Sequence, residues 1–570
     1  MSNEEKVQAK VEVPMITFKV DGQTVSVPKT LPHPVTGKPE PISIIQACAY
    51  VGINIPHLCY HPKLPVAGNC RMCLIEYGMP VLDRERKPVL NPDGSPQIRK
   101  IPRQAIACAT PVAPGMEVYT QTEGVVRSRK AVLEFLALNH PLDCPICDKA
   151  GECKLQEYVH QYGQETSLFF ETKLEKPKKK AISSKIVLDN ERCILCTRCV
   201  RFTEDIAKVP ALGLLNRGAL NTISTYPGTE FEHNYTLNTV DICPVGALTS
   251  RDFRFQMRTW FLAETPSICP NCATGCNILI HSRNGHIYRL TPRENGAVNS
   301  CWMCDSGRLN YKWVNDSRRL SNVLWSEAGR STEINWETAI SKISAALKSS
   351  PKGATAILIS ARQSTEEIYL VSKLAKLLEA QTDSLARTGE GDFLLLNPDM
   401  NPNSKAIQIF GLAAATPGAN VSGIAQAIES GAIRNLIAIG ENPIEMGMEP
   451  GLLSRLDLFV VCDILGNKST LEAQYLLPGA SFAEKQGTFI NAKGRVQRFG
   501  KAFDPTGEAR PEYWILSSLL SALTDRPWPK TPEEIFNMMA AELPAFNGMT
   551  WAKLGTAGMN LLSTTNPTEK

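Results

Sequence analysis

The sequence lacks the features that mark several large classes of protein. No window of about 18 consecutive apolar residues occurs in its 570 residues, so we expect no transmembrane helix. The stretch 1–14 is charged and polar without an apolar core, which argues against a secretory signal. The net charge is only +4, and no long basic stripe interleaved with aromatic residues indicates nucleic-acid binding. These absences favour the cytosol or an equivalent reducing compartment, with any membrane association provided by partner subunits.

Motifs for nucleotide binding are also missing. No G-x-G-x-x-G follows an expected strand and no Walker motif occurs, so direct binding of NADH or a nucleotide is not predicted. The stretch GEGDF at 389–393 is an isolated glycine-rich turn. The one dense basic run, KLEKPKKK at 173–180, is interpreted as a solvated linker.

Cysteine, by contrast, is abundant and unevenly placed. The chain has 18 cysteines, and all but Cys462 lie before residue 305. A disulfide scaffold would require an oxidising compartment and is typical of small secreted domains, so it is not expected here. Thiolates grouped at short spacings in a reducing compartment indicate metal binding instead.

The first candidate site has the spacing C-x10-C-x2-C followed by a distant fourth cysteine, and its residues are Cys59, Cys70, Cys73 and Cys108. Residues 15–28 alternate apolar and polar around Asp-Gly, which predicts a β-hairpin, and 41–53 predict a short helix. This combination resembles a plant-type [2Fe–2S] ferredoxin of the β-grasp fold, although the spacing departs from C-x4-C-x2-C. With four cysteines present, His57 and His61 are expected to pack rather than to bind metal. Zinc is the less favoured alternative.

The second candidate site includes a histidine and has the spacing H-x3-C-x2-C-x5-C, given by His140, Cys144, Cys147 and Cys153. An amphipathic helix is predicted to end near His140, because apolar residues recur before it at helical spacing. A histidine at a helix end is often only a cap, and Cys3His is also a ligand set for structural zinc. The residues alone therefore leave zinc and iron–sulfur open.

The third candidate site is the most specific. It combines C-x2-C-x2-C with a remote Cys-Pro, and its residues are Cys193, Cys196, Cys199 and Cys243. This is the bacterial [4Fe–4S] ferredoxin pattern, and one complete set predicts one cluster. The fourth candidate site has C-x2-C-x3-C from Cys269, Cys272 and Cys276. Its last ligand is either Cys301 or Cys304, and spacing does not choose between them.

Four such sites within about 250 residues favour electron transfer over structural metal binding. Successive redox centres must lie close together for electrons to pass between them, whereas zinc does not change oxidation state. Cys48, Cys462 and one of Cys301 and Cys304 are left over and are expected to be packing residues.

The C-terminal half has a different pattern. Residues 335–347 and 364–380 have helical periodicity. The apolar runs 354–360, 435–440 and 458–464 suit strands of a buried parallel sheet. Alternation of helices and such strands predicts a doubly wound α/β domain.

The order of the four cysteine motifs resembles that of the large iron–sulfur subunit of bacterial NADH:quinone oxidoreductase (respiratory complex I). The similarity runs along nearly the whole chain from about residue 15. Residues 475–498, YLLPGASFAEKQGTFINAKGRVQR, also resemble a signature shared by this large iron–sulfur subunit and molybdopterin-dependent formate dehydrogenases.

The resemblance implies a role for each site residue. It makes His140 the unusual histidine ligand of a [4Fe–4S] cluster and selects Cys304, directly before Asp-x-Gly-Arg, as the last ligand of the fourth site. The chain would hold one [2Fe–2S] and three [4Fe–4S] clusters and no molybdopterin. The fourth cluster is the one least tied to the electron path.

The resemblance also implies a domain order. The expected parts are a β-grasp [2Fe–2S] ferredoxin-like domain (15–125), a His/Cys3 [4Fe–4S] domain with a linker (126–182), a bacterial-ferredoxin-like [4Fe–4S] domain (183–260), a [4Fe–4S] domain of molybdopterin-oxidoreductase type (261–315), a truncated, vestigial molybdopterin-oxidoreductase-like α/β domain (316–525) and a C-terminal tail (526–570). The insertion between Cys73 and Cys108 is expected to be a polar, proline-rich hairpin or loop.

The function implied is electron relay within an enzyme complex, without catalytic residues or substrate turnover in this chain. Electrons would come from a partner flavoprotein that oxidises NADH and pass toward a quinone-reducing module. The other partners would be further subunits of the peripheral arm, on the cytoplasmic side of the inner (cell) membrane, and no nucleic acid.

Related complexes supply the alternatives. A molybdenum or tungsten formate dehydrogenase needs a cysteine or selenocysteine ligand, but residues 384–396 contain neither Cys nor His, and the chain ends without a final pterin-gripping domain. An iron-only hydrogenase needs several more cysteines in the C-terminal half, where only Cys462 occurs. An electron-transfer subunit, or a relative of a catalytic subunit, in an NAD-linked formate dehydrogenase or hydrogenase complex remains the alternative. A zinc-holding structural protein is the contrasting class.

Overall fold

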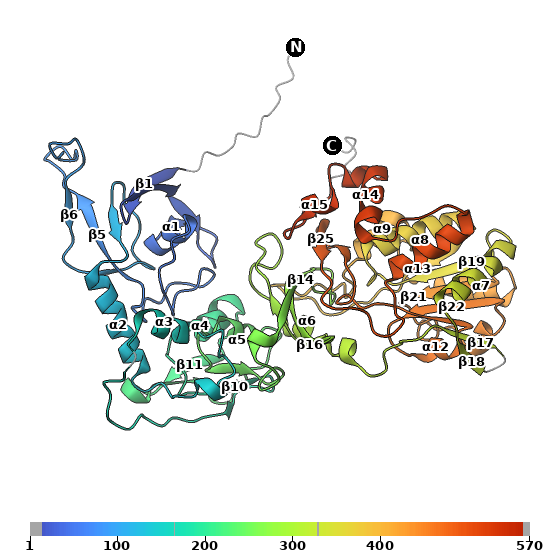
Figure 1. Ribbon diagram of the computed structural model, residues 1–570, viewed down its shortest axis with the longest axis horizontal. Helices are drawn as coiled ribbons and strands as arrows, with labels where there is room; N and C mark the ends of the chain where they lie inside the picture. Colours follow the sequence, from blue (N-terminus) through green and yellow to red (C-terminus); the bar gives the residue numbers. More distant parts are fainter. Residues whose placement is uncertain (1–13, 165, 328–329, 563–570) are drawn as a thin grey trace, which may run out of the picture. The chain divides into compact units, whose positions relative to one another are not determined.

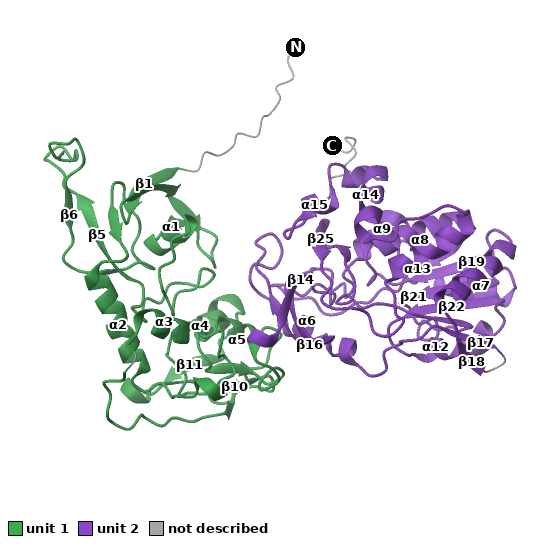
Figure 2. Ribbon diagram, in the orientation of Figure 1, with its two compact units in different colours: residues 1–259 green, residues 260–570 purple. Residues whose placement is uncertain are grey.

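The computed structural model describes residues 14–164, 166–327 and 330–562 (Figure 1). The expectation about a secretory signal falls almost entirely on residues 1–13, outside the described residues. The chain divides into two compact units, residues 1–259 and residues 260–570 (Figure 2). None of the helices that the structure describes is long and apolar enough to cross a membrane.

The first unit begins with a mixed sheet in the order β2-β1-β8-β5-β6, with β7 also pairing with β5. Its strands are β1 (Met15–Val20), β2 (Gln23–Pro28), β5 (Leu74–Pro80), β6 (Ile98–Lys100), β7 (Ala105–Ile106) and β8 (Glu117–Tyr119). The predicted hairpin is present, and Asp21 and Gly22 at its turn have φ of 45° and 85°. Two successive positive φ values form a type I′ turn, which Asp-Gly adopts readily.

The buried face of this sheet packs on one short helix, α1 (Ile44–Tyr50), also predicted from the sequence. Ile16, Phe18 and Val20 alternate with exposed residues along β1 and share a core with Ile44 and Ile45. β8 returns parallel to β1 and closes the sheet around that core. A separate two-stranded ribbon is made by β3 (Thr30–Pro32) and β4 (Pro39–Pro41).

The insertion between Cys73 and Cys108 forms a long hairpin. β5 and β6 pair antiparallel at its base. The Val81 N–H donates to the Gln97 carbonyl at 2.8 Å just beyond these strands, and the isolated bridges Leu82–Pro88 and Leu90–Pro96 close two local turns within the insertion. The predicted proline-rich hairpin is therefore confirmed in its described residues.

Helices dominate the next part of the first unit. α2 (Glu123–Ala137) begins at Thr122, whose hydroxyl accepts a hydrogen bond from the Val125 N–H at 3.2 Å, and it packs on α3 (Lys154–Tyr162). The remaining helical elements are the 3-10 turns η1 (Cys144–Ile146) and η3 (Gly218–Leu220), α4 (Arg198–Arg201), the π-helical turn η2 (Phe202–Ile206) and α5 (Asn238–Ile242). Two small sheets are formed by β9 (Lys180–Ala181), β10 (Ile186–Leu188) and β13 (Leu248–Ser250), and by β11 (Leu212–Leu215) and β12 (Thr222–Thr225).

The basic run 173–180 is attached to the surface along its length. Lys173 donates to the carbonyls of Ala137 and Leu138 at 2.9 and 2.7 Å, just past the end of α2. Lys178 forms ion pairs with Asp143 at 3.1 Å and Glu191 at 2.7 Å. The predicted solvated linker is thus largely exposed, and its lysines in addition find carbonyl and carboxylate partners.

The second unit begins with a three-stranded meander, β14 (Ala263–Ile268), β15 (Asn277–Arg283) and β16 (His286–Pro292). α6 (Asp305–Leu309) and the 3-10 turn η5 (Lys312–Asn315) follow it. Met303, Tyr311 and Val314 join Ile278 and Leu290 in one apolar core beneath the meander.

A seven-stranded sheet forms the centre of the second unit, in the order β18-β17-β23-β22-β21-β19-β20. Its five parallel strands are β19 (Thr355–Ile359), β20 (Gln381–Asp383), β21 (Asn435–Ile439), β22 (Leu458–Asp463) and β23 (Tyr475–Pro478), and the antiparallel edge is β17 (Leu324–Glu327) and β18 (Arg330–Glu333). All three predicted apolar runs are strands of this sheet.

Helices cover both faces of the sheet. Ile357 and Ile359 of β19 belong to the same core as α7 (Trp336–Ser349), α8 (Thr365–Leu378) and α13 (Glu512–Thr524). The alternate residues Ala356 and Leu358 belong to the core with α10 (Val421–Glu429) and α11 (Pro450–Leu453). Burial on both faces explains why these strands are continuous apolar runs.

The C-terminal segment 526–570, expected to be a tail, is folded up to Leu562, where the described residues end. Its elements are α14 (Pro532–Glu542), the 3-10 turn η6 (Pro544–Phe546), α15 (Trp551–Leu554) and β26 (Met559–Asn560). Ile535, Phe536 and Met539 belong to the core that contains α8 and α13. β26 also pairs with β25 (Arg495–Phe499), which pairs with β24 (Gly487–Ile490). Apolar residues at helical spacing give this segment a face to bury.

Candidate metal centres

The four cysteines of the first site meet as two pairs. Cys59, Cys73 and Cys108 are buried in the loops beside the sheet core, and Cys70 is half-buried. A hydrogen bond from the Cys70 thiol lowers the pKa of Cys59 to about 5, and the Cys108 thiol lowers the pKa of Cys73 in the same way. All are free thiols. Two pairs of thiols, one of each pair ready to ionise, suit a group with two metal atoms that each take two thiolates.

The two histidines near the first site have ordinary structural partners. The His57 ring nitrogen Nδ1 lies 2.8 Å from the Ile55 carbonyl oxygen, and the His61 Nδ1 accepts the Lys63 N–H at 3.2 Å. Burial, aided by neighbouring positive charge, lowers the pKa of His61 to about 3. The packing role predicted for His57 and His61 fits these contacts.

The second site lies on the loop that follows α2 and continues through η1 to the start of α3. Cys147 and Cys153 are buried, whereas Cys144 is exposed. Burial raises the pKa of Cys147, and the neighbouring Cys144 thiolate raises it further. Burial followed by the nearby Arg192 charge lowers the pKa of His140 to about 4, so its imidazole is neutral at pH 7. Neutral imidazole is the form in which histidine binds metal.

An ion-pair cluster holds this loop against the third site. The Arg192 guanidinium donates two hydrogen bonds to Asp143 Oδ2, at 3.0 and 2.8 Å, and is 3.4 Å from Asp189. Asp143 precedes Cys144, and Arg192 precedes Cys193. The paired charges therefore join the segments that carry the cysteines of two sites.

Gly246 makes a second junction between these sites. A Cβ on Gly246 would lie 2.2 Å from the Cys147 sulfur, closer than any side chain tolerates. Gly246 follows Cys243 of the third site by three residues. Only glycine therefore allows the third-site loop to pack this tightly on a second-site sulfur.

The cysteines of the third site surround one small cavity, whose lining includes Cys193, Cys196, Cys199 and Cys243. Burial raises the pKa of Cys199 well above its usual value, and the thiolates of the other three raise it further. Mutual repulsion of this kind means that the four sulfurs share one space. A bound cationic group would relieve it.

Each cysteine loop contains a backbone turn with positive φ. Arg71 lies at 59° in the first site, Gly151 at 86° in the second and Gly275 at 62° in the fourth. The third has Leu195 at 54° and Thr197 at 58°, both within CILCTRC, and the first has Gly68 at 64° in addition to Arg71. Positive φ is unfavourable for bulky and β-branched residues and is concentrated at functional sites. The chain thus reverses tightly at each place where cysteines must point inward.

Two arginines of α4 connect the first and third sites. The Arg201 Nη2 donates to the Cys59 carbonyl at 2.6 Å and to the Cys196 carbonyl at 3.1 Å. Its Nη1 donates to the Pro65 carbonyl, and Arg198 donates to the carbonyls of Tyr60 and of Ile242, the latter at 3.0 Å. These arginines, Gly246 and Arg192 were not predicted from the sequence. The only signal was the position of the arginines within or beside the cysteine motifs.

The fourth site brings Cys304 toward the C-x2-C-x3-C loop. Burial raises the pKa of both Cys269 and Cys276 well above the usual value, and the Cys304 thiolate is among the charges that raise them further. Cys304 is the N-cap of α6, and its sulfur accepts the Gly307 N–H at 3.4 Å. A Cβ on Gly307 would lie 2.9 Å from the Cys269 sulfur and 3.2 Å from the Cys304 sulfur.

Of the three cysteines outside the four proposed sites, Cys301 is half-buried and the other two lie in apolar cores. Cys48 is buried in α1 and Cys462 in β22. Burial raises the pKa of Cys48 to about 12 and that of Cys462 well above its usual value. Both thiols are held neutral, which fits the packing role predicted for them.

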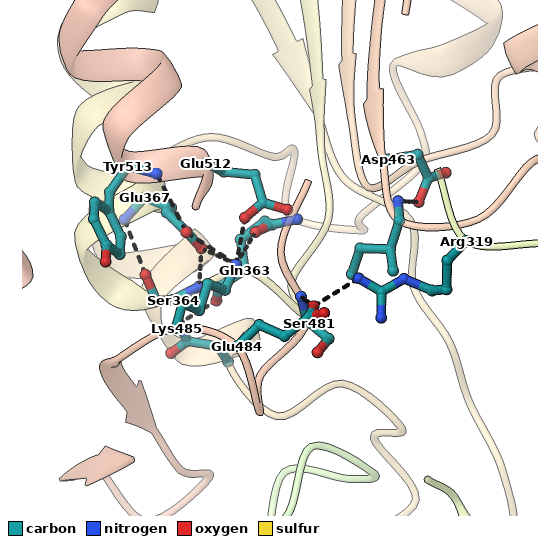
Figure 3. Close-up of polar contacts among 12 residues, drawn as sticks. Arg319, Gln363, Ser364, Glu367, Asp463, Ser481, Glu484, Lys485, Glu512 and Tyr513 are labelled. Carbon is teal, nitrogen blue, oxygen red and sulfur yellow. Dashed lines mark hydrogen bonds and ion pairs between the residues drawn. The ribbon is translucent and has the colours of Figure 1, made fainter. Parts of the chain in front are cut away.

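The α/β domain has a buried ion network near the start of α8 (Figure 3). Lys485 is 2.9 Å from Glu367 and 2.6 Å from Glu512, and it also donates to the Gln363 side chain at 3.1 Å. Glu367 accepts the Ser364 N–H at 2.8 Å in the capping box of α8. Nearby, Arg319 is paired with Glu484 at 2.6 Å. These buried charges are matched within the domain itself.

Within the described residues, no group of three or more His, Cys, Asp or Glu side chains lies close enough to hold a single metal ion. A cluster of several iron atoms makes a different demand, because its ligands are divided among the irons, two to each iron in a [2Fe–2S] cluster and one to each in a [4Fe–4S] cluster. The paired thiols of the first site and the four sulfurs lining the third-site cavity fit that demand.

Five family models match successive parts of the chain. Residues 13–123 match a 2Fe-2S iron-sulfur cluster binding domain, and residues 129–167 match the NADH-ubiquinone oxidoreductase-G iron-sulfur binding region. Residues 183–249 match the ferredoxin-like domain of NADH-quinone oxidoreductase subunit 3. Residues 262–316 match the molybdopterin oxidoreductase Fe4S4 domain, and residues 401–522 match molybdopterin oxidoreductase. The chain thus has the ferredoxin-like, 4Fe-4S and molybdopterin-oxidoreductase domains of the expected fold.

Several curated proteins are similar to the chain. The NADH-ubiquinone oxidoreductase 75 kDa subunit of Reclinomonas americana is 42% identical over 291 residues, which cover 51% of this chain and 37% of that protein. The mitochondrial NADH dehydrogenase [ubiquinone] iron-sulfur protein 1 of Solanum tuberosum is 39% identical over 301 residues, covering 52% of this chain and 36% of that protein. A subunit of the NADH-quinone oxidoreductase of Streptomyces coelicolor is 36% identical over 366 residues, covering 64% of this chain and 40% of that protein. The chain therefore spans well under two thirds of the length of the curated relatives it matches.

One solved structure, that of an NAD+-reducing [NiFe]-hydrogenase in the H2-reduced state, covers 43% of this chain and 91% of its own. It is 27% identical with a TM-score of 0.34, which supports no statement about the arrangement of domains. The named relatives and the matching domain models agree with the order of the cysteine motifs. The predicted resemblance is thereby confirmed: the chain is related, through its iron–sulfur regions, to the large iron–sulfur subunit of NADH:quinone oxidoreductases.

Proposed function

We propose that this chain is the iron–sulfur electron-transfer subunit of an NADH:quinone oxidoreductase. One observation carries the proposal: the cysteine loops of three sites lie in one compact unit and contact one another through Arg201 and Gly246. Electron transfer requires closely spaced centres, and a set of independent structural metal sites has no need of such contacts.

Each site has a proposed occupant. Cys59, Cys70, Cys73 and Cys108 would hold a [2Fe–2S] cluster within a β-grasp domain. The three [4Fe–4S] clusters would be held by His140, Cys144, Cys147 and Cys153, by Cys193, Cys196, Cys199 and Cys243, and by Cys269, Cys272, Cys276 and Cys304. When bound, such clusters take up and release single electrons.

The surrounding residues make the sites suitable for this chemistry. Burial of the third-site cysteines keeps water away, and a low dielectric strengthens the effect of every nearby charge. At the second site a neutral imidazole replaces one thiolate, which makes the group less negative and by itself raises its reduction potential. The exposed Cys144 places one edge of that site at the protein surface.

The partners follow from the resemblance. A flavoprotein subunit that oxidises NADH would donate electrons, and other peripheral-arm subunits would carry them toward quinone. The chain would lie on the cytoplasmic side of the membrane and contact it through those partners. The α/β domain, with its matched internal charges, would serve as a scaffold without a molybdopterin.

The decisive experiment is metal analysis of the full chain purified without oxygen. The proposal predicts about 14 iron atoms per chain, matching acid-labile sulfide, and no molybdenum or tungsten. Zinc with little iron would overturn it in favour of a structural role. Stoichiometric molybdenum or tungsten would favour the formate-dehydrogenase alternative, which is consistent with the molybdopterin-oxidoreductase match over 401–522.

The fourth-site assignment has its own matched pair of variants. Cys304→Ala is expected to remove about four iron atoms per chain, because it deletes one ligand of a [4Fe–4S] cluster. Cys301→Ala is the control and is expected to retain the iron content of the unaltered chain. Loss of iron from Cys301→Ala alone would reverse the assignment.

A further inference from the structure

Arg201 makes an unusual set of contacts for an arginine. One nitrogen, Nη2, donates to two carbonyl oxygens, those of Cys59 at 2.6 Å and Cys196 at 3.1 Å. Cys59 is a proposed ligand of the first site and Cys196 of the third. One guanidinium thus spans directly from the backbone of one ligand to the backbone of another.

Arg198, three residues earlier on α4, repeats the arrangement. It donates to the carbonyl of Tyr60, next to Cys59, and to the carbonyl of Ile242, next to Cys243. Asn69, next to Cys70, adds a contact from its side-chain amide to the Leu195 carbonyl at 3.2 Å. Three polar side chains therefore connect residues beside first-site ligands to residues beside third-site ligands.

No carboxylate balances these two arginines in the described part of the chain, where their hydrogen bonds go to carbonyls and, for Arg201, also to the Thr197 hydroxyl at 3.3 Å. Arg198 is only 8% exposed. A buried cation without a partner anion is strongly unfavourable. The negative groups that act on both arginines are cysteine thiolates of the first and third sites, including Cys59 and Cys196.

The positive charge of Arg201 should affect the reduction potentials of the first and third sites together. Reduction adds a negative charge to an iron–sulfur group, and a nearby fixed positive charge in a low dielectric favours the reduced form. Hydrogen bonding and net charge near the sulfurs are the levers that set such potentials. An arginine placed between two sites therefore raises both potentials together.

We propose that Arg201, supported by Arg198, is a positioning residue that fixes the first site against the third and raises the reduction potentials of the groups bound at both. The proposal rests on the proposed function, because it requires iron–sulfur groups at these sites. Lysine cannot replace Arg201 fully, because a single ammonium lacks the planar fork that reaches carbonyls of two segments.

The test is a redox titration of the full, iron-loaded chain followed by EPR, with Arg201→Gln and Arg201→Lys as variants. Arg201→Gln is expected to lower the reduction equilibrium constants of the first and third groups about tenfold, or about 59 mV for a one-electron couple. The second group should keep its potential. Arg217→Gln is the control, since Arg217 is an exposed residue of the same unit.

Arg201→Lys separates charge from position. It keeps the positive charge, so both potentials should stay near those of the unaltered chain, while the magnetic interaction between the reduced first and third groups weakens. A purely structural role would not move the potentials in Arg201→Gln. If Arg201→Gln does not retain iron, the test depends on Arg201→Lys. An unaltered magnetic interaction between the first and third groups in Arg201→Lys would then overturn the proposal.

Full iron loading with unchanged potentials in Arg201→Gln would equally overturn the proposal while leaving the electron-transfer function intact. Absence of iron from the unaltered chain would instead refute the proposed function. The two failures are thus distinguishable in the same set of preparations.

Discussion

Buried positive charge has two kinds of partner in this molecule, and the contrast is sharpest between Lys485 of the second unit and two arginines of the first. In the second unit Lys485 is enclosed between Glu367 and Glu512, at 2.9 and 2.6 Å. In the first unit Arg198 and Arg201 hydrogen-bond to carbonyls, with no carboxylate among their described contacts. Arg192 of the first unit is paired with Asp143 and Asp189. The contrast therefore lies in Arg198 and Arg201, whose negative neighbours are cysteine thiolates of the first and third sites.

The difference indicates what each region is built for. Matched buried pairs contribute little net stability, but removing one partner is costly because a charge is left alone. A region that lacks the matching carboxylates is expected to depend on what its cysteines bind. Stability and cofactor content should thus be linked throughout the first unit, whereas in the second unit the link should be confined to the fourth site and not extend to the α/β domain.

Removing the iron is the most direct test of this difference between the two units. Stripping the clusters with a chelator should destabilise the first unit by at least about 3–5 kcal/mol, the usual effect of leaving a buried charge without its partner. Thermal unfolding of the full chain, followed by circular dichroism, should then show an earlier transition for the first unit. The transition of the second unit, apart from its own site, should stay in place.

Two transitions that move equally after iron removal would contradict the comparison. A chelator control on the iron-free protein distinguishes loss of iron from a direct effect of the reagent.

Lys485→Met tests whether the stability of the second unit depends on its own buried ion pairs. It leaves Glu367 and Glu512 buried together without a cation and should destabilise this unit by about 3–5 kcal/mol. Denaturant unfolding monitored by tryptophan fluorescence measures the loss, and iron at the first three sites should be unchanged. Lys493→Met, at an exposed position of the same region, is the matched control. A loss of first-unit iron in Lys485→Met would show that the units are not independent.

The pH dependence of the second unit sharpens the comparison further. Burial raises the pKa of Glu366 from 4.5 to about 7 in the folded protein. The folded state then keeps a proton that the unfolded chain has lost, so the free energy of unfolding should fall as pH rises from about 4.5 to about 7. The change is on the order of 3 kcal/mol and should end above that range. Denaturant unfolding across this range measures it.

Glu366→Gln supplies the control for this measurement, because it keeps the shape of the side chain and removes its titration. The slope of stability against pH should flatten in the variant. An equal slope in both proteins would exclude Glu366 as its source.

A glycine-to-alanine substitution beside a cysteine sulfur, made once in each unit, compares the packing of a site in the two units. Gly246→Ala places a Cβ 2.2 Å from the Cys147 sulfur, and Gly307→Ala places one 2.9 Å from the Cys269 sulfur. Overpacking of this size destabilises by about 1–3 kcal/mol. EPR should show a perturbed second site in Gly246→Ala and a perturbed fourth site in Gly307→Ala.

Gly296→Ala serves as the reference for both variants, because a Cβ there meets nothing within 4 Å. Perturbation of the same site by both Gly246→Ala and Gly307→Ala would contradict the assignment of separate sites to separate units.

The sequence predicted those features that follow from local pattern. The buried strands β19, β21 and β22 are recognisable because burial on both faces demands an unbroken apolar run. The hairpin of β1 and β2 follows from alternation around Asp21-Gly22. Cysteine spacing predicted the close groups of cysteines in each motif, whereas the choice of Cys304 over Cys301 came from the family resemblance and stays a prediction.

Contacts between distant segments were beyond such reasoning. Arg198 and Arg201 donate to main-chain carbonyls, which every residue has and no residue type marks. The contact of Gly246 with Cys147 depends on how two loops pack. The basic run 173–180 reads as a linker because its charges suggest solvent, while its actual partners include the carbonyls at the end of α2. The C-terminal segment was predicted to be a tail although it has apolar residues such as Ile535, Phe536 and Met539, because the helices against which they pack lie far away in the sequence.

The carbonyl contacts of Arg198 and Arg201 have a consequence for how these domains can change. Arg198 and Arg201 hydrogen-bond to backbone oxygens of the loop from Cys59 to Pro65. These contacts constrain the backbone path of the loop rather than its sequence. Apart from the proposed ligand Cys59 and the buried Tyr60 and Leu64, side chains of this loop can change so long as the backbone follows the same path. Another cysteine-ligated domain with a different sequence but the same loop path could then replace the first-site domain. The contacts of Arg198 and Arg201 would accept such an exchange during evolution.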